Sequence, residues 1–130
     1  MAALQDTNKP RVFLVEDESL VAMLIEDMLD EIGYSLAGHA SSVTEGVNLA
    51  QRVDAEVCIL DVNIAGVSVF PIAEVLAARG IPFLFSTGYG AAGIPPRWAG
   101  YTVISKPFDI STMAQALQAL VERSMVAKSA

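Results

Sequence analysis

The stretch Val12-Phe13-Leu14-Val15-Glu16-Asp17-Glu18 joins four consecutive apolar residues directly to three acidic ones. A run that is apolar at every position is typical of a parallel β-strand covered on both faces of a sheet. Residues 19–32 then carry apolar side chains at helical spacing and acidic side chains on the opposite side, and Gly33 follows as a helix stop. The stretch therefore predicts a buried strand, an acidic turn and an amphipathic helix, in that order.

The apolar residues of this first helix predict which of its faces is buried. They recur at every fourth position and beside it, as Leu20, Leu24, Met28 and Ile32 with Val21, Ile25 and Leu29. We expect this whole set to face the sheet, because an amphipathic helix buries its apolar stripe.

The same alternation of strand and helix patterns continues along the chain. Further strands are expected at residues 34–39, 57–60, 81–85 and 102–104, and further helices at 43–52, at 67–79 and after Asp109, which is the expected cap. Residues 91–100 are rich in Gly and Pro, so a fourth helix there should be short or irregular. Strict alternation predicts an α/β fold, a doubly wound, five-stranded parallel sheet with helices on both faces.

Length and composition are those of a single domain. The chain has 130 residues, 53% of them hydrophobic, with a mean hydropathy of +0.47. We expect residues 1–10 to form a flexible lead, 11–124 the domain and 125–130 a flexible tail, with no output domain attached.

Charge and cysteine content narrow the setting in which the protein acts. A net charge of −7 disfavours direct nucleic-acid binding, because the phosphate backbone would repel it. The apolar runs are too short to span a membrane, and the first ten residues are unlike a signal peptide. The only cysteine, Cys58, cannot form an internal disulfide. These features predict a cytoplasmic protein without nucleic-acid or membrane partners.

Polar side chains stand where the predicted strands end. Glu16 and Asp17 follow the first strand, Asp61 the third, Thr87 the fourth and Lys106 the fifth. Because parallel strands end at one edge of the sheet, these side chains should converge there. Clustered carboxylates repel one another, and a hard cation with oxygen ligands relieves the repulsion. We therefore expect Mg²⁺ held by Asp17 and Asp61, with Glu16 acting mostly through water.

Such a site suits a phosphoryl group accepted by a carboxylate. Asp61 would be the nucleophile and would form an acyl phosphate. Lys106 and the Thr87 hydroxyl would bind phosphoryl oxygens, and backbone N–H groups near Val62 and Gly88 would bind others. Each residue alone also fits an ordinary role, such as a turn, a cap or a solvated charge. It is their order along the chain, each at a predicted strand end, that carries the hypothesis.

The chain resembles the receiver domain of bacterial response regulators, which is CheY-like and has a flavodoxin-like fold. The resemblance spans residues 11–121 and rests on Val15-Glu16-Asp17-Glu18, Leu60-Asp61-Val62-Asn63, Ser86-Thr87-Gly88 and Lys106-Pro107-Phe108. Residues 82–90, PFLFSTGYG, further resemble the FATGUY subgroup, whose receivers often stand alone.

The resemblance implies a role for each matching residue. Asp61 would be the phospho-acceptor, Glu16 and Asp17 the acid pair, Thr87 the switch hydroxyl and Lys106 the phosphate-contacting lysine. The backbone carbonyl of Asn63 would complete the Mg²⁺ ligands, and the Lys106-Pro107 peptide bond would be cis. The implied protein is a single-domain regulator in two-component signalling rather than an enzyme. Its implied partners are a sensor histidine kinase or phosphotransfer protein and a downstream protein.

Three features depart from the family pattern. Val103 stands where receivers usually carry an aromatic switch residue, three positions before the lysine. The interval from Thr87 to Lys106 is short, and residues 64–66, Ile-Ala-Gly, replace the usual Met-Pro after the acceptor. The usual coupling of threonine to an aromatic rotamer is therefore not expected here.

Three other functions fit these residues less well. A phosphatase or phosphotransferase with an Asp nucleophile would need a second Asp at position 63, which is Asn63. A flavodoxin-like cofactor binder would need an anion-binding loop where Glu16, Asp17 and Glu18 stand. A pseudo-receiver that binds partners without phosphorylation is disfavoured by the complete set of acid pair, acceptor and lysine.

Overall fold

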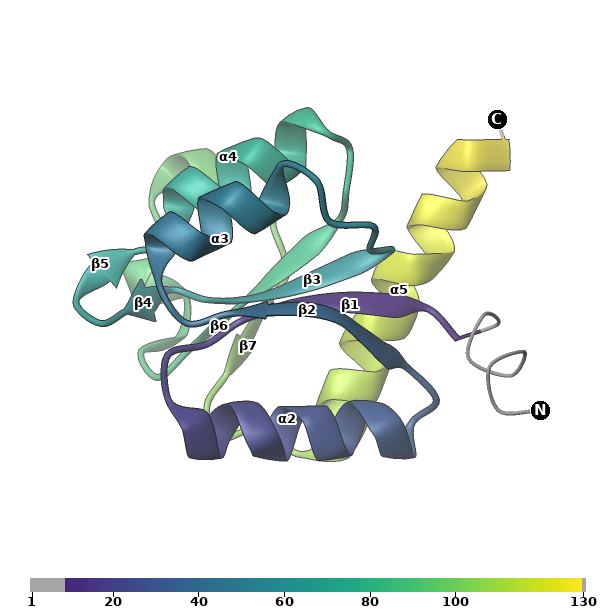
Figure 1. Cartoon of the computed structure of the whole chain (residues 1–130), viewed down its shortest axis with the longest axis horizontal. Helices are drawn as coiled ribbons and strands as arrows, with labels where there is room; N and C mark the ends of the chain where they lie inside the picture. Colours follow the sequence, from purple (N-terminus) through teal and green to yellow (C-terminus); the bar gives the residue numbers. More distant parts are fainter. Residues whose placement is uncertain (1–8, 130) are drawn as a thin grey trace.

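Five parallel strands form the central sheet of the computed structural model, which describes residues 9–129 and their side chains except at 91 and 124–129. The sheet order is β2-β1-β3-β6-β7 (Figure 1). These strands are β1 (Arg11–Val15), β2 (Ser35–Ala40), β3 (Val57–Asp61), β6 (Phe83–Thr87) and β7 (Val103–Ser105). The helices are α2 (Ser19–Glu31), α3 (Val43–Ala50), α4 (Phe70–Ala78) and α5 (Ile110–Ser129).

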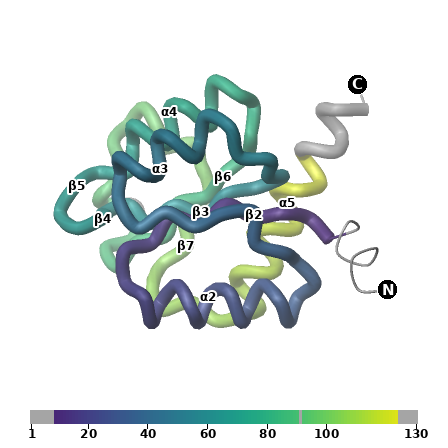
Figure 2. Tube along the Cα trace, in the orientation of Figure 1, coloured from purple at the N-terminus to yellow at the C-terminus, as the bar shows by residue number. Residues whose placement is uncertain are grey.

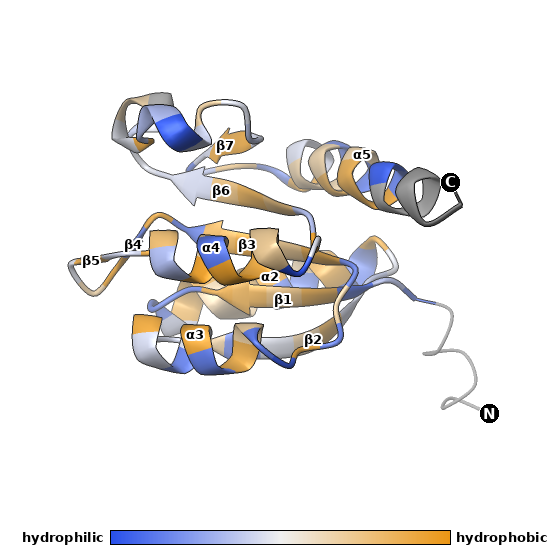
Figure 3. Ribbon diagram, turned by 90° about the horizontal axis from the view of Figure 1, so that it is seen from above, coloured by the Kyte–Doolittle hydropathy of each residue, from blue (hydrophilic) through white to orange (hydrophobic). Residues whose placement is uncertain are grey.

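Helices cover both faces of the sheet, as predicted for a doubly wound fold. Helices α3 and α4 pack on one face around Phe13, Leu60 and Phe85, and α2 and α5 pack on the other around Leu14 and Ile59. Strands β1 and β3 are drawn mostly in the orange of hydrophobic residues, whereas α3 and α4 alternate between orange and blue (Figure 3). The apolar runs of the sequence are thus the buried centre of the sheet.

A small antiparallel ribbon lies at the edge of the sheet where β1 and β3 end (Figure 2). It consists of β4 (Asn63–Ile64) and β5 (Val67–Ser68). The predicted start of the helix at residue 67 was therefore wrong, since α4 begins at Phe70. The reason is a tight turn at Ala65 (φ 51°) and Gly66 (φ 83°), whose left-handed backbone suits a two-residue hairpin.

The predicted buried face of α2 was partly wrong. Ala22, Ile25 and Leu29 are buried, whereas Leu20 is 76% and Leu24 59% exposed. The helix is apolar around more of its circumference than one stripe against the sheet can cover. An apolar surface remains on the helix as a result.

The segment between β6 and β7 is irregular, as predicted. It holds two short 3₁₀ turns, η1 (Gly90–Gly93) and η2 (Pro96–Trp98), instead of an α-helix. The last helix begins as expected, because Asp109 Oδ1 accepts a hydrogen bond from Thr112 N at 2.8 Å.

The expected chain ends are tested only in part. Residues 1–8 of the expected lead lie outside the described residues, and α5 continues to Ser129 without a break at residue 124. The flexibility of both ends stays a prediction. Within residues 9–129, none of the helices combines the length and the apolar character that a membrane crossing requires.

Candidate functional site

Lys106 joins two acidic residues from different strands. Its ammonium nitrogen Nζ lies 2.9 Å from Glu16 Oε1 and 3.0 Å from Asp61 Oδ2. Glu16 follows β1 and is 1% exposed, and Asp61 ends β3 and is 7% exposed. The convergence predicted from parallel strands is therefore present for these three residues.

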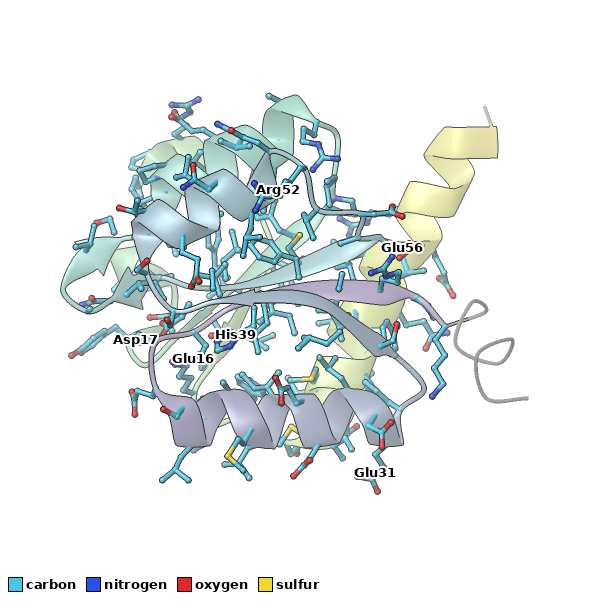
Figure 4. The ribbon with its side chains drawn as sticks, viewed as in Figure 1. Glu16, Asp17, Glu31, His39, Arg52 and Glu56 are labelled. Carbon is cyan, nitrogen blue, oxygen red and sulfur yellow. The ribbon has the colours of Figure 1, made fainter. Side chains whose placement is uncertain are left out.

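Glu16 lies beside Asp17 and His39 near the end of β1 (Figure 4). Its second carboxylate oxygen, Oε2, accepts from Glu18 N at 3.1 Å. Its backbone N–H donates to Ala40 O at 3.0 Å, and its backbone carbonyl lies 2.9 Å from His39 Nε2, which donates to it. Both carboxylate oxygens of Glu16 are thus engaged, which suits an indirect role toward a metal ion. This contact of His39 with the loop after β1 was not predicted, because no motif in the sequence involves His39.

Asp17 tethers the β4–β5 ribbon to the site. Its Oδ2 accepts from Ala65 N at 2.9 Å, and Asn63 Oδ1 accepts from Gly66 N at 2.8 Å within the same turn. Residues 64–66, which replace the usual Met-Pro, therefore supply a backbone N–H that donates to Asp17 of the acid pair.

Burial and charge shift the ionisation of two of these groups. Burial raises the pKa of Glu16, and the nearby Asp61 charge adds to this, against the hydrogen bonds from Lys106 and Glu18. Burial alone would lower the pKa of Lys106, but its hydrogen bonds to Glu16 and Asp61 raise that pKa on balance. Lys106 is therefore held as a cation opposite the acceptor candidate.

The donor atoms fit a hard divalent cation. Carboxylate oxygens of Glu16, Asp17 and Glu18 lie within 4.8 Å of one another, and Asp17 and Asp61 line one cavity. Oxygen-only ligation is what Mg²⁺ prefers. Glu18 was not among the predicted ligands, although it directly follows the predicted acid pair in the sequence.

The cavity is open and has a volume of about 640 Å³. Asn63, Thr87, Gly88 and Lys106 stand in its wall, together with the exposed Tyr89. The Thr87 hydroxyl oxygen accepts from Tyr89 N at 3.0 Å. All residues predicted for the site except the buried Glu16 therefore line one cavity at the carboxyl edge of the sheet.

One predicted backbone donor is not available. The Val62 N–H donates to Ser86 O at 3.1 Å, because Val62 still continues the pairing of β3 with β6. The next N–H, that of Asn63, points to Asp61 Oδ1 at 3.4 Å. Both N–H groups therefore have partners in this structure, and the phosphate-binding role expected for the Val62 N–H stays a prediction.

Aromatic residues fill the space beside the irregular segment. The Tyr101 ring stacks on Phe83 with centroids 4.6 Å apart, and Trp98 packs edge-on to Phe85 at 6.2 Å. Phe70 contacts both Phe85 and Trp98 and also reaches the wall of the cavity. These rings belong to the irregular segment, to β6 and to α4. The usual position of the aromatic switch is occupied by Val103, which has no ring.

The backbone around Lys106 ties β7 to β6. Lys106 N donates to Thr87 O at 2.8 Å, and the Lys106-Pro107 peptide bond is cis. The lysine backbone is thereby held beside the end of β6.

Comparison with known proteins identifies the family. Residues 12–118 match the response regulator receiver domain. The chain belongs to this family. PdtaR, a transcriptional regulatory protein of Mycobacterium tuberculosis, is 30% identical to it over 117 residues, which are 87% of this chain and 57% of PdtaR. The receiver chain thus spans little more than half the length of this curated relative.

Solved structures support the same assignment. SdrG from Sphingomonas melonis Fr1 is 36% identical with a TM-score of 0.77, over 87% of this chain and 97% of SdrG. A BeF3-activated SdrG structure is 37% identical with a TM-score of 0.74, over 85% and 95%. The receiver domain of the sensor histidine kinase PA1611 from Pseudomonas aeruginosa PAO1 shares the fold at 20% identity, with a TM-score of 0.74 over 88% and 98%. That structure has a magnesium ion in its active-site cleft.

Proposed function

We propose that this receiver accepts a phosphoryl group on Asp61 from a phosphohistidine of a sensor kinase or phosphotransfer protein, and then signals by docking on a downstream protein. The observation that carries the proposal is the Lys106 ammonium, 3.0 Å from Asp61 Oδ2 at the rim of an open cavity. A fixed cation beside a carboxylate neutralises the charge that an incoming phosphoryl group brings.

The transfer forms one bond and breaks another. A carboxylate oxygen of Asp61 attacks phosphorus, and the phosphorus–nitrogen bond breaks with its electron pair going to the imidazole nitrogen of the donor. The product is an acyl phosphate on Asp61. Lys106 then faces a phosphoryl oxygen, and the Thr87 hydroxyl, which lines the same cavity, binds another.

The acidic residues are suited to hold Mg²⁺ during this reaction. Asp17, Asp61 and the Asn63 carbonyl would be direct ligands, and Glu16 would act through water because both its carboxylate oxygens have partners. When bound, Mg²⁺ offsets negative charge on the phosphoryl oxygens. The magnesium ion in the cleft of the PA1611 receiver supports this assignment.

The exposed side of α2 is suited to meet the phosphate donor. Leu20, Met23 and Leu24 are all more than half exposed. Beside them, a shallow apolar groove of about 330 Å³ is lined by residues of α2 and by Lys106, Pro107 and Phe108. An apolar surface that continues to the active lysine would let a kinase dock with its phosphohistidine at Asp61.

The protein is proposed to act on its own side chain, not as an enzyme on separate substrates. Asn63 stands where an Asp-nucleophile phosphatase would carry a second Asp as acid and base. Slow hydrolysis of the acyl phosphate would reset the receiver. We place the protein in the cytoplasm, where its kinase partners present their phosphohistidine.

Incubation with acetyl phosphate and Mg²⁺ tests the proposal. Wild type should gain one phosphoryl group, measured as intact mass, and Asp61→Asn should gain none. Asp54→Asn is the matched control, because Asp54 is a highly exposed carboxylate that pairs with Arg11 at the start of β1, at the edge of the sheet opposite Lys106. Equal labelling of wild type and Asp61→Asn would refute the acceptor assignment.

A further inference from the structure

Ser86 is a buried serine whose hydroxyl has no assigned role. It is 1% exposed and lies in β6, one residue before Thr87. Within the part of the chain whose side chains are described, its Oγ has no hydrogen-bond partner. A buried hydroxyl without a partner is unfavourable, so its position next to the site calls for a physical reason.

The strand register places Ser86 on the same face of the sheet as the active groups. Ser86 pairs with Asp61 of β3 on one side and with Ile104 of β7 on the other. Residues directly opposite each other in paired strands project to the same face. Lys106 is two residues beyond Ile104, and its ammonium reaches this face at Glu16 and Asp61.

The Lys106 side chain reaches across β6 to Asp61. Its backbone is held on the outer side of β6 by the bond to Thr87 O, whereas Asp61 lies on the inner side, in β3. Strands are spaced by about 4.8 Å, so the lysine stem spans the strand that separates it from Asp61. Ser86 is the residue of β6 at that level of the sheet and on that face.

The Lys106 ammonium has a hydrogen left for another acceptor. It carries three N–H groups, and among the described residues two are taken, by Glu16 and Asp61. A phosphoryl group on Asp61 would draw the ammonium away from the Asp61 oxygen. The ammonium would then have an N–H group available for a neutral acceptor on this face of the sheet.

We propose that Ser86 is a positioning residue for Lys106, whose hydroxyl accepts a hydrogen bond from the ammonium once Asp61 carries a phosphoryl group. This inference rests on the proposed function. The serine is unpaired in the resting protein and paired in the phosphorylated one. It therefore favours the phosphorylated state by a differential contact.

Substitution of Ser86 by Ala tests the inference through opposite effects on two states. Without ligand, Ser86→Ala should melt at the same temperature as wild type or higher, because it removes an unpaired buried hydroxyl. With Mg²⁺ and beryllofluoride, a phosphoryl mimic, its affinity for the mimic should fall by about tenfold, as expected for a lost hydrogen bond to a charged group. Melting curves over a series of beryllofluoride concentrations measure both quantities.

Ser105→Ala is the matched control, since Ser105 is exposed and pairs with Thr87 on the opposite face from Ile104. It should bind the mimic like wild type. Loss of affinity in both serine variants, or in neither, would overturn the role of Ser86. Failure of wild type itself to bind the mimic would instead overturn the proposed function.

A second measurement uses the wild-type protein alone. Proton NMR should show a nuclear Overhauser contact between the Ser86 β-protons and the Lys106 ε-protons that strengthens when beryllofluoride and Mg²⁺ are added. A contact that stays unchanged or weakens on loading would contradict the inference without any substitution.

Discussion

Lys106 is the residue on which the electrostatics of the site depend. It balances two carboxylates that would otherwise face each other in a partly buried place, and the hydrogen bonds to them raise its pKa above the ordinary value of 10.5. A group that holds its proton more tightly in the folded state than in the unfolded state stabilises the folded state while it is protonated. Its contribution is fully present below pH 10.5 and is lost as pH rises through the raised folded pKa.

The alkaline stability of Lys106→Met should therefore differ from that of wild type in a defined way. At pH 8 the variant should have the lower free energy of unfolding, because Glu16 and Asp61 lose their shared cation. Above pH 10.5 the difference should shrink, since wild type loses the same charge. Urea unfolding of both proteins from pH 8 to 11.5 measures it. A difference that stays constant over this range would contradict the account.

The main site residues could be predicted from the sequence because strand ends in a parallel sheet meet at one edge. Asp61, Thr87 and Lys106 each follow an apolar run, and that position alone brings them together. Backbone details could not be predicted this way. Whether the Val62 N–H is engaged depends on where the pairing of β3 with β6 stops, and the pattern of residue types does not record that.

At the scale of elements, α2 serves two purposes. Its buried side packs on the sheet through Ile25 and Leu29, and its other apolar side is left open. Hydrophobic periodicity predicted the helix but not this division. Apolar residues on the outer face of α2 recur at the same spacing as those on the inner face, so the spacing does not show which of them are buried.

Substitution of Leu20 and Leu24 by Ser should slow phosphoryl transfer from a partner kinase by about tenfold or more, because the docked complex would no longer bury these two apolar side chains. Phosphorylation by acetyl phosphate should be unchanged, since Asp61 and Lys106 are untouched. Leu36→Ser, on edge strand β2, is the control. Equal loss with both phosphate donors would show damage to the site instead of lost docking.

Arg79 fastens helices α3 and α4 together. It directly follows α4, and its Nη1 donates to Ala50 O at 2.7 Å and Val53 O at 2.9 Å. Ala50 is the last residue of α3 and Val53 lies just beyond it, where carbonyls no longer have partners within the helix. Arg79→Met should therefore lower the free energy of unfolding by about 1–3 kcal/mol. The exposed Arg52→Met should change it far less, and chemical denaturation of both variants checks this.

At the scale of the whole molecule, the order of elements was predictable and the irregular segment was only partly so. Alternating buried runs and amphipathic runs leave little choice but a doubly wound sheet. The Gly and Pro residues among 91–100 indicated that the segment after Thr87 lacks a regular helix. The aromatic packing of Phe83 against Trp98 and Tyr101 depends on contacts between residues far apart in sequence, which periodicity does not carry.

Mg²⁺ should raise the melting temperature of the whole domain, because a ligand that binds the folded state alone stabilises it. The stabilisation should be largely lost in Asp17→Asn, whose carboxylate lies in the acidic cluster. The exposed Asp27→Asn on α2 should respond like wild type. Melting curves over a series of Mg²⁺ concentrations provide the measurement, and an equal response of the Asp17 variant would remove that residue from the metal site.

Chemical trapping of the phosphorylated residue tests the central claim most directly. Borohydride reduces an acyl phosphate on an aspartate to homoserine, and peptide mass spectrometry locates the product. After phosphorylation with acetyl phosphate and Mg²⁺, we predict homoserine at position 61. A phosphorylated protein with homoserine elsewhere, or with none, would contradict the account.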